Sequence, residues 1–210
     1  MRPLPRVHAV TDAALLALDD FPVRAAAIAA SGSAVAIHVR DLGATAARLS
    51  AATRRVQALA RPAEASVFVN GRPDLAAALG TQGLQLGQRD LVPADARAAF
   101  AGHWQGWIGA SVHSASEADA AIDAGADFLM VGNLYETTTH PGRPGIGLAL
   151  LSQLSARGIP VIGIGGITGE RVAAVRDAGA YGVAAIGALW RAGDPARAAQ
   201  DFLLPWSEAA

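Results

Sequence analysis

The chain contains no cysteine. It also contains no lysine, since all 17 of its Lys and Arg positions are arginine. Without cysteine it forms neither disulfides nor zinc–thiolate sites, and without lysine it forms no Schiff base and no lysine clamp on a phosphate. Charged residues make up only 17% of the 210 residues, and the formal net charge is −1. No basic run marks a surface for nucleic acid or for an anionic membrane, so we expect neither as a partner.

Long hydrophobic runs are also missing. The uncharged stretch 98–116 contains His, Gln, Ser and Gly, and no apolar signal core follows the first six residues. These features predict a cytoplasmic protein without a membrane span. The apolar residues, 52% of the chain, are enough for one domain over residues 1–210 whose strands are covered on both faces.

Short runs of Val, Ile and Ala alternate with Ala-rich stretches of helical spacing along the whole chain. The expected strands cover residues 7–11, 34–40, 65–70, 83–87, 106–111, 128–132, 160–165 and 181–186. The expected helices cover residues 44–59, 73–79, 94–100, 116–124, 147–156 and 169–178, and glycines follow the last three as helix C-caps. Eight such βα units predict an α/β fold, a single (β/α)₈ TIM barrel.

Glycines end the last two expected strands, at Gly165-Gly166 and at Ile186-Gly187. Glycine lets the backbone approach an anion closely, and barrels often bind phosphate with these two loops and a short extra helix. The alternative is that these glycines only make tight turns and allow close helix packing. We expect a phosphate of a small ligand at these loops.

His38 and Arg40 lie two residues apart on the second expected strand, so their side chains project from the same face. A buried cation is costly unless it is paired. A bound anionic ligand would pair with Arg40; the alternative is an ion pair in the barrel floor with Asp41 or Asp12.

Other polar residues follow the ends of neighbouring strands. Asn70 ends the third expected strand, Asp90 follows the fourth, and Ser111 and His113 close the fifth. In a barrel all these positions lie at the C-terminal mouth, where active sites are found. Simple loop chemistry explains each of them equally well, and His113 also suits the N-terminal region of the next helix.

The loop at residues 132–147 is longer than the join from a strand to a helix requires, and it carries Asn133, Thr137, Thr139 and His140. Long ordered loops at this end of a barrel tend to act as lids over a site. The alternative is a solvated loop with a simple turn.

Seven short motifs occur in an order typical of one superfamily: HAVTD at 8–12, IHVR at 37–40, VNGRPDLA at 69–76, QLGQRD at 85–90, SVHS at 111–114, ETTTHPG at 136–142 and IPVIGIGGIT at 159–168. Taken together they resemble the thiamin phosphate synthase superfamily over nearly the whole chain. The resemblance implies a barrel that binds a small phosphorylated thiazole. It assigns the substrate-binding residues Arg40, Asn70, Ser111, Thr137, Thr139, Gly165, Gly166, Ile186 and Gly187.

Two activities are known in that superfamily. The synthase joins a pyrimidine diphosphate to thiazole phosphate with loss of pyrophosphate, and the TenI-type tautomerase aromatises a thiazole phosphate carboxylate by proton transfer. The synthase pattern has two pyrophosphate-binding lysines and a metal-binding Asp where this chain has Leu42, His140 and Gly71. Only Arg40 and Asp90 remain, and losing a single charge-stabilising group costs roughly 10²–10³ in rate.

We therefore expect a TenI-type thiazole tautomerase that needs no cofactor. Its pattern has a proton-transferring His where this chain has Asn133, so we expect His140 or His113 to replace it, helped by Asn133, while His38 orients the ring. The alternatives are a synthase, with Mg²⁺ at Asp90, and a non-catalytic regulator that only binds the ligand. Apolar residues expected to be exposed near the C-terminus, Trp190, Leu203 and Trp206, predict a homodimer.

Overall fold

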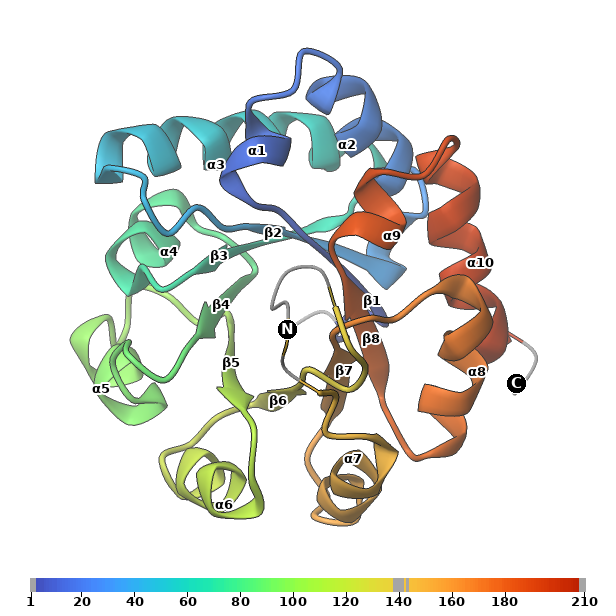
Figure 1. The fold of residues 1–210 in the computed structure, drawn as a ribbon. Coiled ribbons are helices and arrows are strands. Elements are labelled where there is room, and N and C mark those ends of the chain that lie inside the picture. Colours follow the sequence, from blue (N-terminus) through green and yellow to red (C-terminus); the bar gives the residue numbers. More distant parts are fainter. Residues whose placement is uncertain (1–2, 138–141, 143, 208–210) are drawn as a thin grey trace.

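The computed structural model describes residues 3–137, 142 and 144–207, which form a closed barrel of eight parallel strands in the order β1 to β8 (Figure 1). The strands are β1 (Val7–Val10), β2 (Val35–Val39), β3 (Ser66–Asn70), β4 (Gly83–Leu86), β5 (Trp107–Val112), β6 (Phe128–Val131), β7 (Val161–Ile164) and β8 (Gly182–Ala185). Pairing of β1 with β8 closes the ring. This confirms the predicted (β/α)₈ TIM barrel.

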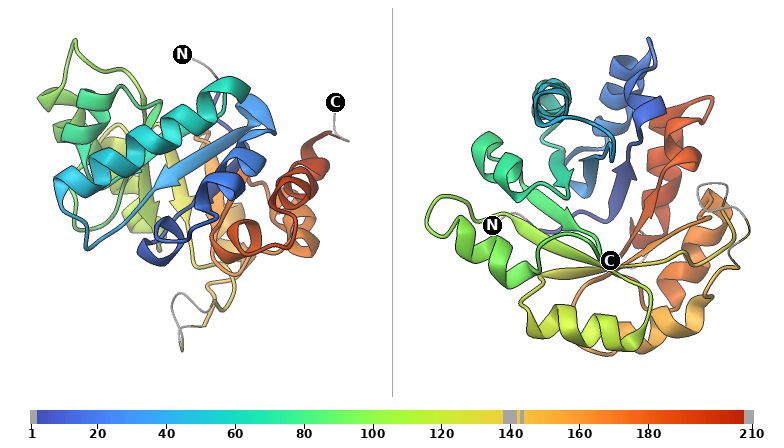
Figure 2. Two further views of the ribbon diagram at one scale, coloured as in Figure 1. Left: turned by 90° about the horizontal axis from the view of Figure 1, so that it is seen from above. Right: turned by 60° about the vertical axis from the view of Figure 1, so that its left-hand side comes forward.

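Helices surround the strands on the outside, as the turned views show (Figure 2). They are α1 (Ala13–Leu16), α2 (Phe21–Ala29), α3 (Ala46–Ala60), α4 (Pro73–Leu79), α5 (Pro93–Ala99), α6 (Ala115–Asp123), α7 (Leu148–Ser155), α8 (Gly169–Asp177), α9 (Gly187–Trp190) and α10 (Pro195–Ser207). The 3₁₀ turns η1 (Gly32–Ala34) and η2 (Arg61–Ala63) precede β2 and β3. The sequence pattern predicted α3 to α8 within about two residues but missed the one-turn α1 and the longer helices α2 and α10.

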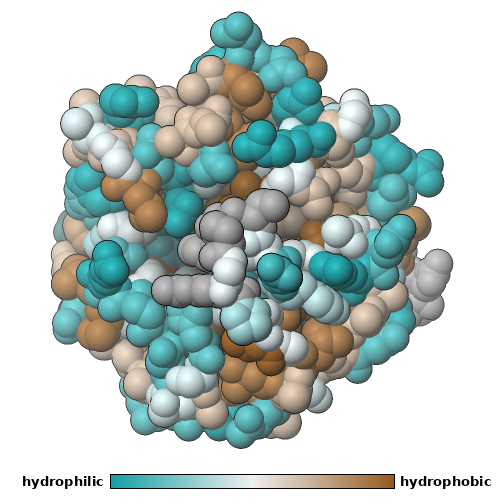
Figure 3. Space-filling view, viewed as in Figure 1, coloured by the Kyte–Doolittle hydropathy of each residue, from teal (hydrophilic) through white to brown (hydrophobic). Residues whose placement is uncertain are grey.

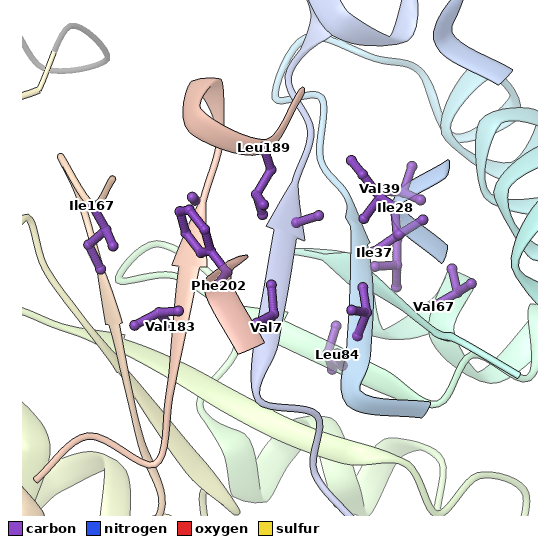
Figure 4. Close-up of a cluster of buried hydrophobic side chains, with 14 of the residues drawn as sticks. Val7, Ile28, Ile37, Val39, Val67, Leu84, Ile167, Val183, Leu189 and Phe202 are labelled. Carbon is purple, nitrogen blue, oxygen red and sulfur yellow. The ribbon is translucent and has the colours of Figure 1, made fainter. Parts of the chain in front are cut away.

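The main hydrophobic core lies between the barrel and its helices. Alternate strand residues point outward, among them Val7 of β1 and Val183 of β8, which pair in register. Figure 4 shows Phe202 of α10 beside these two valines, and all three side chains are buried. Burying a side chain of this kind contributes about 1.5–3 kcal/mol, so this layer holds each helix against the sheet.

Glycines end the helices as the sequence predicted. Gly125 and Gly179 adopt φ angles of 78° and 98° directly after the last turns of α6 and α8. This left-handed conformation costs glycine little, and it turns the chain back toward the next strand.

The C-terminal helices pack on α2 instead of presenting an apolar surface. Trp190 is fully buried and stacks on Phe21 with ring centroids 5.2 Å apart, while Leu203 and Trp206 are partly buried against the core. The predicted exposure of Trp190 is therefore wrong, and the homodimer stays a prediction without that support. Among the described residues, no helix is long and apolar enough to cross a bilayer.

Candidate active site

Two phenylalanine rings fill the floor of the barrel. Phe68 of β3 and Phe128 of β6 point inward, and their centroids lie 6.0 Å apart. They fit because the facing positions are Gly83 and Gly109: a β-carbon on either would collide with the ring of Phe68 or Phe128, respectively. The interior below the mouth is therefore solid, and the site lies above it.

Two histidines lie on this floor and are fully buried. His8 Nδ1 is 2.8 Å from His38 Nε2, and His8 Nε2 is 3.0 Å from the backbone oxygen of Pro5. Burial lowers the pKa of His8 to about 4, although the Pro5 carbonyl opposes the shift. Burial, and then the neighbouring His8, lower the pKa of His38 well below 6.5. Both rings are thus neutral at pH 7.

Amide and hydroxyl groups form a polar layer above the histidines, at the ends of β3 to β5. The side-chain oxygen of Asn70 is 3.2 Å from His38 Nδ1, and Gln85 Nε2 donates to Ser111 Oγ at 3.0 Å. Gln85 Oε1 is buried and has no hydrogen-bond partner among the described residues. The sequence reading gave Gln85 no role, although its alternation with Gly83 and Gly87 on one strand face was a usable signal.

Arg40 follows β2 at the same mouth. Its backbone N–H donates to the buried Thr11 Oγ1 at 2.9 Å, which fixes the start of its loop. The two carboxylates proposed as floor partners have other roles, because Asp12 accepts from the N–H of Leu15 and Asp41 accepts from that of Gly43. No carboxylate in the described part of the chain forms an ion pair with the Arg40 guanidinium.

Asp90 lies beside Gly71 where the loops after β3 and β4 meet. A β-carbon on Gly71 would lie 3.1 Å from Asp90 Oδ1, and Asp90 Oδ2 accepts from the N–H of Gly87 at 2.7 Å. Three His, Asp or Glu side chains do not gather as a metal site anywhere in the described residues. Mg²⁺ is commonly held by one or two carboxylates plus substrate phosphates, so a single Asp fits this mode but not a protein-only cage.

The start of the loop after β6 is tied to β7. Leu134 and Tyr135 donate backbone hydrogen bonds to the carbonyls of Ile164 and Gly165, and Asn133 Nδ2 donates to the Tyr135 carbonyl at 3.2 Å. Thr137 is the last residue before the gap in the described residues. Thr139 and His140, expected at the site, lie outside the described residues.

The two glycine-ended loops follow β7 and β8, as predicted. Gly165 and Gly166 have φ angles of 97° and 65°, and β-carbons there would approach Asn133 and the Glu136 carbonyl at 2.4–2.5 Å. Close packing thus requires both glycines, which was the alternative reading, while anion binding by their loop stays a prediction. Gly187 differs, since it begins α9 after Ile186, and among the described residues a β-carbon there would meet only Arg191 Cδ, at 3.8 Å.

His113 stands at the rim, at the start of α6. Its side chain is 53% exposed, and its Nδ1 lies 3.2 Å from Glu117 Oε2 of the same helix. The structure therefore gives His113 a local carboxylate partner. The face around the mouth is mostly hydrophilic in Figure 3, with hydrophobic residues in separate spots.

Comparisons with known proteins agree with this architecture. A family model described as thiamine monophosphate synthase matches residues 7–189. Two relatives are called thiamine-phosphate synthase: that of Marinobacter nauticus is 36% identical over 89% of this chain and 83% of its own length, and that of Salinispora arenicola is 38% identical over 97% and 98%. The thiamine phosphate pyrophosphorylase structure from Pyrococcus furiosus has a TM-score of 0.81, 31% identity and coverage of 97% and 96%.

These relatives overturn the expectation of a thiazole tautomerase. That expectation relied on the two missing lysines, on Gly71 in place of an Asp, and on another histidine taking over the role of the one replaced by Asn133. The relatives that share most of the chain nevertheless carry the synthase name. Proton transfer by His140 or His113 with the help of Asn133, and orientation of the ring by His38, were expected for the tautomerase reaction and do not carry over to a synthase. Similarity over 89% and 97% of the chain outweighs departures at a few single positions. With a matching model over residues 7–189 and relatives at this identity, the chain belongs to the thiamine monophosphate synthase family.

Proposed function

We propose that the chain is a thiamine-phosphate synthase, a transferase that joins a pyrimidine diphosphate to thiazole phosphate and releases pyrophosphate. The observation that carries the proposal is the similarity to relatives of that name over nearly the full chain. The polar residues at the mouth of the barrel, Arg40, Asn70 and Ser111, are consistent with it. In this reaction a bond to the thiazole forms while the bond to the diphosphate breaks. The chemical demand is stabilisation of the departing pyrophosphate.

Arg40 and Asp90 supply the charge chemistry at this mouth. Arg40 has no ion-pair partner among the described residues, so its guanidinium is available to bind diphosphate oxygens in its forked geometry. Asp90 would hold Mg²⁺ together with the substrate's own phosphates, and bound Mg²⁺ neutralises charge on the leaving group. Gly71 offers no second carboxylate, so we expect weaker Mg²⁺ binding than at a two-carboxylate site, and a higher Mg²⁺ concentration for half-maximal activity.

We place the thiazole phosphate on the side of the mouth formed by β7 and β8, opposite Arg40 and Asp90. The loops at Gly165–Gly166 and Ile186–Gly187 would hold its phosphate, with the free N–H groups at the start of α9 as donors. Thr137 and Thr139 stay predicted substrate-binding residues of the adjoining loop. A cytoplasmic location, a homodimer and the absence of a nucleic-acid partner also stay predictions.

A direct assay tests the proposal. The purified chain is mixed with the pyrimidine diphosphate, thiazole phosphate and Mg²⁺, and both thiamine phosphate and pyrophosphate are measured. We expect the two products in equal amounts. Binding of both substrates without turnover would favour the non-catalytic regulator and overturn the synthase proposal. An Arg40→Ala variant should lose most of the rate, whereas Arg54→Ala, on the outer face of α3, should not.

A further inference from the structure

A buried hydrogen-bond chain links the bottom of the barrel to the candidate site. It starts at the Pro5 carbonyl, which lies 3.0 Å from His8 Nε2, and continues over 2.8 Å from His8 to His38. His38 Nδ1 then lies 3.2 Å from the amide of Asn70. Both histidines are fully buried, and the proposed reaction uses neither of them directly.

Each histidine in this chain carries one N–H and one lone pair. A neutral imidazole has one donor nitrogen and one acceptor nitrogen, and which is which depends on its partners. Phe68 and Phe128 surround His8, with centroids at 5.6 Å and 5.8 Å, and Phe68 also lies 4.8 Å from His38. Such apolar surroundings disfavour a charged ring, which is consistent with the lowered pKa values.

The Pro5 carbonyl fixes the direction of the whole chain, because a carbonyl oxygen only accepts. His8 Nε2 must therefore carry the proton, which leaves the lone pair on His8 Nδ1. His38 Nε2 then donates to that lone pair, so His38 Nδ1 has a lone pair and needs a donor. The only group of Asn70 that donates from its side chain is the amide NH₂.

The amide of Asn70 should accordingly have its nitrogen toward His38. The nearest atom to His38 Nδ1 is Oδ1, but the two ends of a carboxamide have the same shape and are assigned from their partners. The chain order supports the reversed orientation. The pairing of β2 with β3 ends at Val39 and Val69, and Arg40 and Asn70 are the next residues of the two segments. A positive charge on Arg40 at this mouth would favour the oxygen end of the amide on the mouth side.

We propose that Pro5, His8 and His38 form a positioning relay that holds the Asn70 amide with Oδ1 toward the barrel mouth. This proposal rests on the proposed function and deepens it. Because β3 lies across the ring from β7, the substrate at Asn70 is the pyrimidine diphosphate, while thiazole phosphate occupies the glycine loops. Asn70 Oδ1 accepts a hydrogen bond from an N–H or O–H group of that substrate, and a substrate group that only accepts is disfavoured there.

The first test reads the proton positions directly and needs no activity. Long-range ¹⁵N–¹H NMR of the ¹⁵N-histidine-labelled chain distinguishes the Nε2–H from the Nδ1–H tautomer. The rings of His8 and His38 are identified by the loss of their signals in His8→Leu and His38→Gln. We expect Nε2–H on both rings at pH 7.5. An Nδ1–H form of either ring, or a charged ring, would overturn the relay.

The second test asks whether the relay acts through Asn70. In the His8→Leu variant the constraint on His38 is removed, so we expect the KM for the pyrimidine diphosphate to rise about threefold to tenfold, the value of one hydrogen bond. In an Asn70→Ala background the same substitution should leave that KM unchanged. An equal rise in both backgrounds would indicate a general packing defect and overturn the proposal.

The control and the readouts keep this inference separate from the proposed function. His103→Gln, an exposed histidine in the turn before β5, should change neither the tautomers nor the KM. If the chain has no synthase activity, the proposed function fails, while the NMR measurement still decides whether the relay exists.

Discussion

Gly71 and Asp90 lie against each other at the ends of β3 and β4, so that a β-carbon on Gly71 would be 3.1 Å from Asp90 Oδ1. Within the described residues, Asp90 belongs to no cluster of three His, Asp or Glu side chains. Its Oδ2 is anchored by the N–H of Gly87, which fixes the side chain. Because the Asp90 side chain is anchored, an Asp90→Asn substitution would remove its charge while keeping its shape, so the effect of the charge on the rate can be measured.

Replacing Asp90 by Asn should lower the kcat/KM of the synthase reaction about 100-fold, because one charge-stabilising group contributes roughly 10²–10³ in rate. The Asn oxygen can still accept from Gly87, so the melting temperature should hold. Pyrophosphate release measured against Mg²⁺ concentration gives the result. Asp123→Asn, at the exposed end of α6, is the matched control, and an unchanged Mg²⁺ dependence in Asp90→Asn would remove Asp90 from the metal site.

Stability should fall as the pH is lowered through the range set by His8. Its pKa is lowered from 6.5 to about 4 in the fold, so the unfolded chain binds the proton more readily between these values. The stabilisation is complete above pH 6.5 and is lost as the pH falls toward 4, by about 2 kcal/mol at pH 5. His38 shifts in the same direction.

Urea unfolding at pH 7.5 and pH 5 measures this difference. His8→Leu should make the free energy of unfolding less dependent on pH over that range, whereas His103→Gln should leave the dependence unchanged. If the two variants show the same pH dependence as the parent chain, His8 is not the group responsible.

Gly109→Ala should destabilise the fold by about 1–3 kcal/mol, the usual cost of overpacking a core. The added methyl would collide with the ring of Phe128 and with Gln85 Oε1, both of them buried. Thermal unfolding followed by circular dichroism measures the change. Gly193→Ala is the control, because a β-carbon there meets nothing within 4 Å. A Gly109→Ala chain as stable as the parent would mean that the floor is loosely packed.

Gly187→Val should raise the KM for thiazole phosphate about tenfold, which corresponds to roughly 1.4 kcal/mol. The β-carbon has room, since its only near neighbour in the described part of the chain is Arg191 Cδ at 3.8 Å, so the fold should be kept. The bulky side chain would instead screen the N–H groups at the start of α9. Steady-state kinetics with each substrate varied in turn separates this effect from a change at the pyrimidine side. Thiazole phosphate binding equal to that of the parent would refute the placement of its phosphate.

The sequence predicted the barrel well because each strand is a buried apolar run that ends at a turn residue. It missed α2 and α10 for opposite reasons. Residues Phe21–Ala29 are so rich in alanine and other apolar residues that no polar face marks a helix, and Pro205 lies inside the C-terminal helix. Both helices are defined by their packing on each other, which periodicity does not reveal.

At the site, the residues at strand ends were predictable and those in the middle of strands were not. His38, Arg40, Asn70 and Ser111 follow from the rule that parallel strands bring their C-terminal ends together. His8 received no role, because nothing in β1 alone shows that its ring meets His38 of the neighbouring strand. That contact depends on register, in which Val10 pairs with His38 and His8 with Ala36.

The interlocked floor of Phe68, Phe128, Gly83 and Gly109 makes the barrel a vessel with one opening. Whatever binds above it enters and departs through the same mouth. In the proposed reaction both substrates and both products would therefore share this one route.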